Sequence, residues 1–170
     1  MRTFSTTLII ALFLIVSTTQ AQTKLKIGYI DSNELLMMMP ERDSAKVTLE
    51  NYAKTLEKQL MTMSSEFDAK LQDFQQQQAN LSELIKQTKT NELQELKTRI
   101  ENFQVSAQQD LENKEAELLN PIIAKAKKAI EDVAKENSYT FILDVASGAL
   151  LYHDAGENIL ALVKKKLGLQ

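Results

Sequence analysis

The chain has 170 residues and a formal net charge of −3 at pH 7, with no cysteine, no tryptophan and only 6% aromatic residues. The absence of cysteine excludes disulfides and lipid attachment through a cysteine, and the acidic balance argues against nucleic acid as a partner, because phosphate binding needs a basic surface. Few aromatic residues and abundant Gln, Glu and Lys are typical of helical rods rather than of a globular enzyme.

The first 21 residues have the pattern of a signal peptide. Arg2 precedes an apolar run over residues 8–16, and Thr19 and Ala21 place small residues at the positions that a signal peptidase reads. The run is shorter than the roughly 20 residues that span a bilayer, so a retained anchor is the less favoured alternative. We therefore expect export, with cleavage after about Ala21.

Residues 22–39 are expected to form the first part of a small β-containing body. Residues 24–31 predict a strand with Leu25, Ile27 and Tyr29 on one face. Asp31 followed by Glu34 has the spacing of a capping box, which predicts a short helix over residues 32–38.

A long helical region follows, from about residue 40 to residue 137. Pro40 suits the first helical position, because its missing N–H costs nothing there. Apolar residues then recur at alternating spacings of four and three, which predicts the seam of a coiled coil. The seam residues near the centre of this region are Phe67, Leu71, Phe74, Ile100, Phe103 and Ala107.

The two halves of this region mirror each other about Gln87. In both halves the regular spacing breaks into four-four, at Phe67 and at Ala107, and such breaks should occur at one height on two paired helices. This favours an antiparallel hairpin over residues 40–120, with its tip near residues 86–90 and Asn91 as the cap of the returning helix. The same mirror places Lys114 opposite Leu60 and Pro121 opposite Ala53.

Residues 121–170 are expected to complete the body. Pro121 predicts a kink where the hairpin leaves the body, with helix continuing to Glu136. Residues 139–145 and 149–153 predict two strands joined by a tight connection. Asp154 with Glu157 would start a last helix, which carries lysines at its negative end and stops at Gly168.

These elements define an α+β fold that is mainly α: a long antiparallel coiled-coil hairpin inserted in a small three-stranded β-body. Three short strands and two short helices make a poor core on their own, so we expect the body to oligomerise. The residues expected in the oligomer body are Ile27, Tyr29, Phe141, Leu143, Leu151 and Tyr152.

Patterns for catalysis, cofactors or metals are weak. No nucleotide-binding glycine loop is present, and His153 is the only histidine, so one chain offers no histidine cluster for a metal. Asp110, Glu112, Glu115 and Glu117 are interpreted as a solvated helix flank rather than as a cation site. We expect no cofactor, no metal and no enzymatic activity.

The whole predicted mature chain resembles the Skp/OmpH-like family of periplasmic chaperones. The matching segments are KIGYIDSNELL, the proline-led helical pair, NPIIAKAKKAIEDVAKEN and the ending YTFILDVASGALLYHDAGENILALVKKK. The resemblance implies a periplasmic homotrimer whose hairpins surround a cavity for unfolded outer-membrane β-barrel proteins, held without ATP. It also suggests membrane lipid or lipopolysaccharide as a further partner.

One departure concerns charge. Well-known members of that family are basic, whereas residues 41–136 here contain 14 basic and 18 acidic side chains, a net charge of −4. This argues against steering of clients by a positive cavity.

Several apolar residues lie off the predicted seam: Tyr52, Met61, Leu84, Val105 and Leu119. They either widen the seam and pack near the body, or they contact an unfolded client, a role that suits flexible methionine. For Met37, Met38 and Met39, at the root of the arm, we favour a place in the core. The alternative function is a structural or adaptor coiled-coil protein of the cell envelope without chaperone activity.

Overall fold

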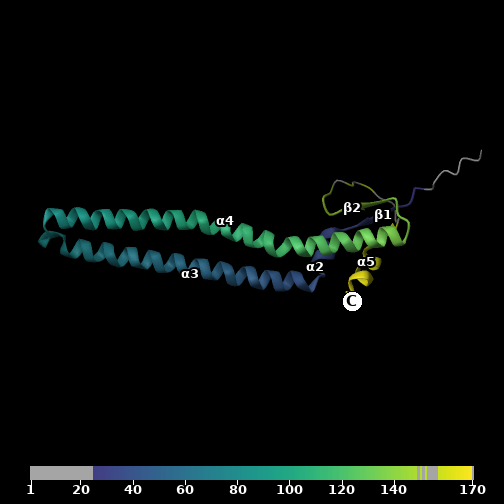
Figure 1. Ribbon diagram of the computed structural model, residues 1–170, viewed down its shortest axis with the longest axis horizontal. Helices are drawn as coiled ribbons and strands as arrows, with labels where there is room; N and C mark the ends of the chain where they lie inside the picture. Colours follow the sequence, from purple (N-terminus) through teal and green to yellow (C-terminus); the bar gives the residue numbers. More distant parts are fainter. Residues whose placement is uncertain (1–24, 149, 151, 153–156, 170) are drawn as a thin grey trace, which may run out of the picture.

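Two long helices project side by side from a small body in the computed structural model, which describes residues 25–148, 150, 152 and 157–169 (Figure 1). The predicted signal peptide lies outside the described residues. The long helices are α3 (Pro40–Gln77) and α4 (Glu83–Glu136). The body contains β1 (Ile27–Ile30), α2 (Ser32–Met37), β2 (Phe141–Asp144), β3 (Glu157–Asn158) and α5 (Leu160–Leu167).

The body is built on a three-stranded sheet in the order β2-β1-β3, with both outer strands parallel to β1. Ile27 pairs with Phe141 and Ile30 with Asp144. The two paired strands therefore stand before and after the long helices in the sequence. At Gly28 a Cβ atom would lie 2.9 Å from Ile159 Cγ2, so glycine allows the close approach of the chain after β3. The strands predicted at residues 24–31 and 139–145 are confirmed in shorter form.

The third strand differs from the prediction. Ala149, Leu151 and His153 of the predicted strand lie outside the described residues, and Leu150 and Tyr152 are in no strand. Glu157, which was expected to start the last helix, belongs to β3, and Ile159 N–H extends the ladder by donating to Tyr29 O at 3.0 Å. The helix starts later because Asn158 Oδ1 accepts from Leu160 N–H at 2.9 Å. Its predicted stop at Gly168 is confirmed, since Gly168 has a φ of 71°.

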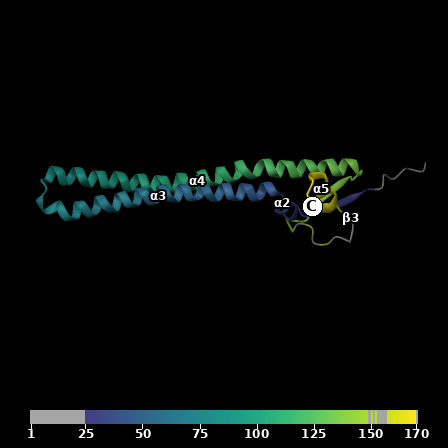
Figure 2. The same ribbon diagram turned by 90° about the horizontal axis from the view of Figure 1, so that it is seen from below.

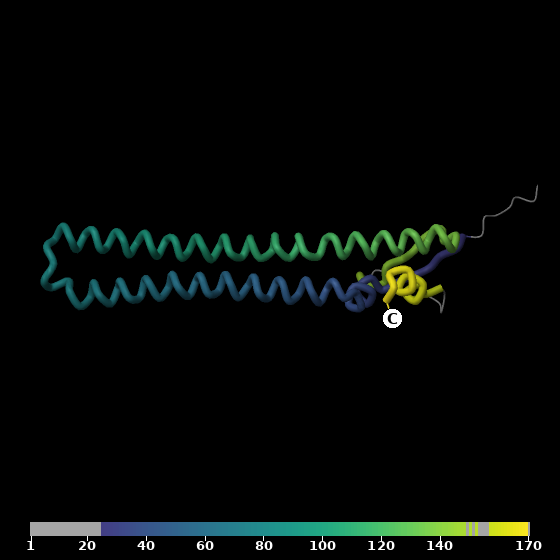
Figure 3. Tube along the Cα trace, turned by 60° about the horizontal axis from the view of Figure 1, so that its bottom comes forward, coloured from purple at the N-terminus to yellow at the C-terminus, as the bar shows by residue number. Residues whose placement is uncertain are grey.

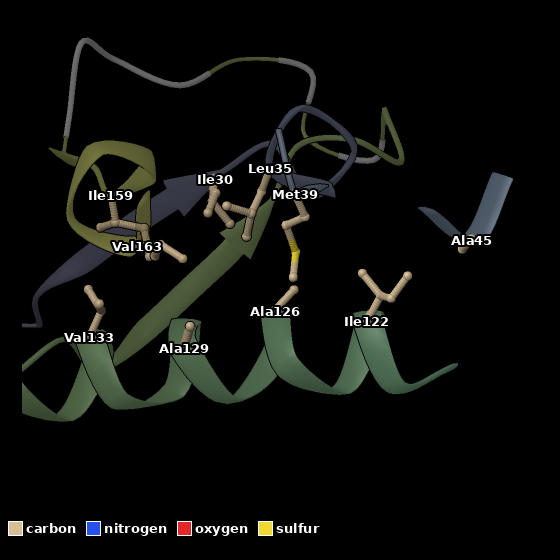
Figure 4. Packing of buried hydrophobic residues seen from close by; sticks show 10 residues of the cluster. All are labelled: Ile30, Leu35, Met39, Ala45, Ile122, Ala126, Ala129, Val133, Ile159 and Val163. Atoms are coloured by element: carbon tan, nitrogen blue, oxygen red, sulfur yellow. The ribbon is translucent and has the colours of Figure 1, made fainter. Parts of the chain in front are cut away.

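The core of the body lies between the sheet, α2, α5 and the last part of α4 (Figure 4). The predicted start of α2 at Asp31 is confirmed, because Asp31 Oδ1 accepts from Glu34 N–H at 3.0 Å as an N-cap. On α4 the buried residues recur at spacings of four, three and four, which is one helix face. Those residues are Ile122, Ala126, Ala129 and Val133, and they meet Ile30, Leu35, Met39, Ile159 and Val163.

Only one of the three consecutive methionines belongs to this core. Met39 is buried, but Met37 and Met38 are exposed, which corrects the prediction that all three would be internal. Both lie at the end of α2, where its C-terminal residue and cap turn outward before Pro40 begins α3.

The two long helices form an out-and-back pair, which the perpendicular view and the chain trace both show (Figures 2 and 3). The predicted tip is wrong: residues 86–90 are helical, and the chain turns at Gln78–Asn80. The returning helix is capped by Ser82, whose Oγ accepts from Ile85 N–H at 3.4 Å, and not by Asn91.

The predicted pairing is wrong as well. Lys89 Nζ lies 3.0 Å from Asp73 Oδ2, and these numbers sum to 162, whereas the predicted mirror required 174. Ala107 therefore shares a groove with Ala53, Leu56 and Leu60 instead of facing Phe67. α4 does continue past Pro121 to Glu136 as predicted, but Pro121 does not lie opposite Ala53.

Candidate functional site

All six residues expected on the seam are half-buried: Phe67, Leu71, Phe74, Ile100, Phe103 and Ala107. Two helices alone cannot enclose a side chain on all sides, so most of the seam keeps some contact with solvent. Away from the body, Leu96 is the exception among the described arm residues, with 1% of its surface exposed.

Ion pairs join the two helices at the root and near the tip. At the root Lys125 Nζ donates to Glu41, and this hydrogen bond holds the pKa of the Glu41 carboxyl below its usual value. Near the tip, Lys89 and Asp73 pair across the helices. Lys114, which the predicted mirror placed opposite Leu60, instead binds Glu117 on its own helix, with Nζ–Oε2 at 2.9 Å. The two cross-helix pairs fix the register at both ends.

The five predicted client-binding residues fall into two groups. Met61, Leu84 and Val105 are exposed by 66%, 72% and 74%. Tyr52 and Leu119 are half-buried, and Leu119 packs against the core of the body. Val47 and Ile85 are also exposed, although the sequence analysis missed them. Both lie off the seam, so their positions relative to the heptad pattern could have identified them as exposed.

One face of the sheet is apolar and open. Along β1, Gly28 and Ile30 are buried while Ile27 is exposed. The neighbouring residues of β2 on the same face as Ile27, Phe141 and Leu143, are 55% and 39% exposed. Exposed aromatic and aliphatic side chains that adjoin on a sheet are typical of an association surface. Tyr29 is half-buried, Tyr152 is 81% exposed, and Leu151 lies outside the described residues.

Polar contacts join the strands at both ends of this sheet. At the N-terminal ends of the strands, Lys26 Nζ lies 4.1 Å from the centre of the Tyr139 ring and 3.2 Å from Glu157 Oε2. Burial, together with a hydrogen bond to Glu157, raises the pKa of Tyr139 to about 12. At the C-terminal ends, Ser32 Oγ donates to Asp144 Oδ2 at 2.6 Å and Ala146 N–H donates to Oδ1 at 3.0 Å. These contacts tie the start of the chain to its end.

Asp144 makes this connection sensitive to acid. Partial burial raises its pKa, but the hydrogen bonds from Ser32 and Ala146 outweigh burial, so the pKa lies below the ordinary 3.8. The carboxylate therefore stabilises the fold at neutral pH, and this contribution is lost as the pH falls through the folded-state pKa. We expect the melting temperature of Asp144→Asn to be lower at pH 7 and to fall less on acidification than that of the unmodified protein.

The control for this measurement is Ser32→Ala, which removes the main donor and keeps the carboxylate. Its melting temperature should also depend less on pH below about 4. An equal acid-induced loss in all three proteins would contradict the role of this hydrogen bond.

Within the described residues no three His, Asp or Glu side chains are placed to hold a metal ion. The carboxylate of Glu112 accepts from Gln108 Nε2 on its own helix, as a solvated flank does. His153 lies outside the described residues. None of the described helices is both long and apolar enough to cross a membrane.

Comparison with known proteins points to one family. Residues 26–167 match the family model described as Outer membrane protein (OmpH-like). The chain is 29% identical over 150 residues to Chaperone protein Skp of Photorhabdus luminescens, covering 86% of this chain and 88% of the relative. It is 26% identical over 145 residues to the protein of the same name from Yersinia enterocolitica, covering 84% and 85%.

Proposed function

The chain belongs to the OmpH-like family, and from this premise we propose that it is a holdase chaperone of the periplasm. In this proposal the arms hold unfolded outer-membrane β-barrel proteins and keep them from aggregating, without ATP. Residues 1–21 serve as signal peptide, residues 22–39 and 121–170 form the body, and residues 40–120 form the arm.

The observation that carries the proposal is an arm with apolar side chains spread over its surface. The 38 residues of α3 extend for about 57 Å at ~1.5 Å per residue. Met61 and Val105 lie within about a helical turn of the same height on the arm, and Leu84 lies in the first turn of α4 near the tip. Each of the three is largely exposed. Such dispersed contacts suit a mobile, unfolded chain better than a folded partner. The relatives are named as chaperones, which supports the same conclusion.

The open face of the sheet supports assembly into a homotrimer. Ile27, Phe141 and Leu143 would be buried between subunits, and the arms would then enclose a cavity. Each contact with a client is weak, so affinity would come from several arms acting on one chain. Release would need no chemical energy, only a more stable folded destination in the membrane.

The test is an aggregation assay with a denatured outer-membrane β-barrel protein. We expect the full-length mature protein to keep the client soluble at a ratio of about one trimer to one client chain. A variant that lacks residues 48–119, with residues 47 and 120 joined by a short glycine linker, should lose this protection. Equal protection by both proteins would contradict client binding by the arms, and protection by neither would favour a structural or adaptor coiled-coil role.

A further inference from the structure

A groove opens between α3 and α4 in the half of the arm nearer the body. Its volume is about 180 Å³, and its apolar walls include Leu56, Leu60, Phe103 and Leu111. Ala53 and Ala107 line the same groove from opposite helices. Because both are alanines, the seam lacks side-chain volume at this height, and the larger neighbours leave a hollow between them.

One charged side chain lines this groove, and it is acidic. Glu57 is exposed and makes no ion pair within the described part of the chain. The other polar lining residues, Gln104 and Gln108, are neutral, so the Glu57 carboxylate sets the charge at the groove. A second groove, which Phe103 also borders, contains Lys58 as its charged residue instead. The two grooves therefore differ in sign at neighbouring positions of one helix.

We propose that the Glu57 groove receives an apolar side chain of an unfolded polypeptide that carries a lysine or arginine two positions away. This inference rests on the proposed client binding and specifies which client segments bind here. In an extended chain, side chains two positions apart point the same way and lie about 6.6 Å apart, at ~3.3 Å per residue. The basic side chain can then reach Glu57 while its neighbour occupies the groove.

Charge complementarity favours basic over acidic segments at this groove. An acidic segment would meet Glu57 with like charge, and residues 41–136 as a whole carry a net charge of −4. A single exposed ion pair changes affinity by about 1.4- to 5-fold. The preference should therefore be modest for one groove, and salt should weaken it.

The experiment compares two fluorescent peptides of equal length in an anisotropy titration with the full mature protein. Both repeat a unit of an apolar residue (leucine or phenylalanine), a serine, a charged residue and a serine, so that a charged side chain lies two positions from each apolar one. The charged residue is lysine in one peptide and glutamate in the other. We expect Glu57→Gln to weaken binding of the lysine peptide about 1.4- to 5-fold. The same substitution removes a like charge facing the glutamate peptide, so binding of that peptide should stay the same or become tighter. Lys58→Gln is the matched control and should not weaken the lysine peptide. Ala107→Leu fills the groove and should also weaken binding of the lysine peptide.

The outcomes separate this inference from the proposed function. It is overturned if Glu57→Gln and Lys58→Gln alter the lysine peptide equally, or if Ala107→Leu leaves its affinity unchanged. It is also overturned if neither peptide binds while the protein still protects a β-barrel client, since the arms then hold clients elsewhere. Unchanged helix content and melting temperature of Glu57→Gln would confirm that the substitution leaves the fold intact. Failure of the proposed function is recognised separately, by the loss of any difference between the full and the arm-deleted protein.

Discussion

Replacing Leu96 with alanine is expected to lower the free energy of unfolding of the arm by about 2–5 kcal/mol. Leu96 is 1% exposed, and it is the one arm residue in the described structure that is fully enclosed away from the body. Truncation removes the buried methyl groups and leaves a cavity that a two-helix arm fills only partly. The measurement is urea unfolding followed by far-UV circular dichroism, which reports mainly on the long helices.

The matched control is Leu84→Ala, the same chemical change on the same helix. Leu84 is 72% exposed, so its truncation should alter the free energy of unfolding by no more than about 0.5 kcal/mol. Equal destabilisation by both variants would mean that Leu96 does not anchor the seam. Loss of client protection by Leu84→Ala at unchanged stability would instead support a direct contact with clients.

Replacing Phe141 with aspartate is expected to convert the proposed homotrimer into monomers at micromolar concentration. Phe141 is 55% exposed on the open face of the sheet and adjoins Ile27 on β1. Burying an unpaired carboxylate in an apolar interface costs several kcal/mol, which is enough to dissociate an oligomer of ordinary affinity. Sedimentation velocity gives the subunit number of both proteins.

Leu84→Asp is the control for this prediction, since it places the same charge on an exposed leucine in the first turn of α4. This end of α4 lies far from the sheet (Figure 1). It should sediment as the unmodified protein does. Two results would refute the role of the sheet face: an unmodified protein that is monomeric, or a Phe141→Asp variant that stays assembled with unchanged helix content.

Local signals in the sequence predicted much of the fold. Asp31 and Glu34 marked the start of α2, Pro40 marked the start of α3, and the apolar spacing identified the seam. Each of these features depends on residues within a turn or two of one another. The register of the hairpin, that is, which residue of α3 lies opposite which residue of α4, did not follow from the same pattern. A heptad repeat fits many registers equally well. The Ser82 cap and the pair of Asp73 with Lys89 distinguish among them.

The third strand and the exposure of single arm residues were also not predictable from local sequence. β3 has two polar residues, Glu157 and Asn158, which show no strand pattern and are ordered by pairing with β1. Among the candidate client-binding residues, sequence position alone could not separate Leu119, which packs on the body, from Val105, which is exposed. The role of the exposed residues in binding clients stays a prediction.

The parallel pairing of β1 with β2 has a consequence for the order of folding of a chain that is synthesised from its N-terminus. Ile27 is made first and has to wait for Phe141, 114 residues later, before the central pair of strands can close. Closing so long a loop in a flexible chain is slow and entropically costly. Contacts between α3 and α4 are far more local near Gln78–Asn80, so zipping of the helices from that turn would bring the two distant strands within reach of each other.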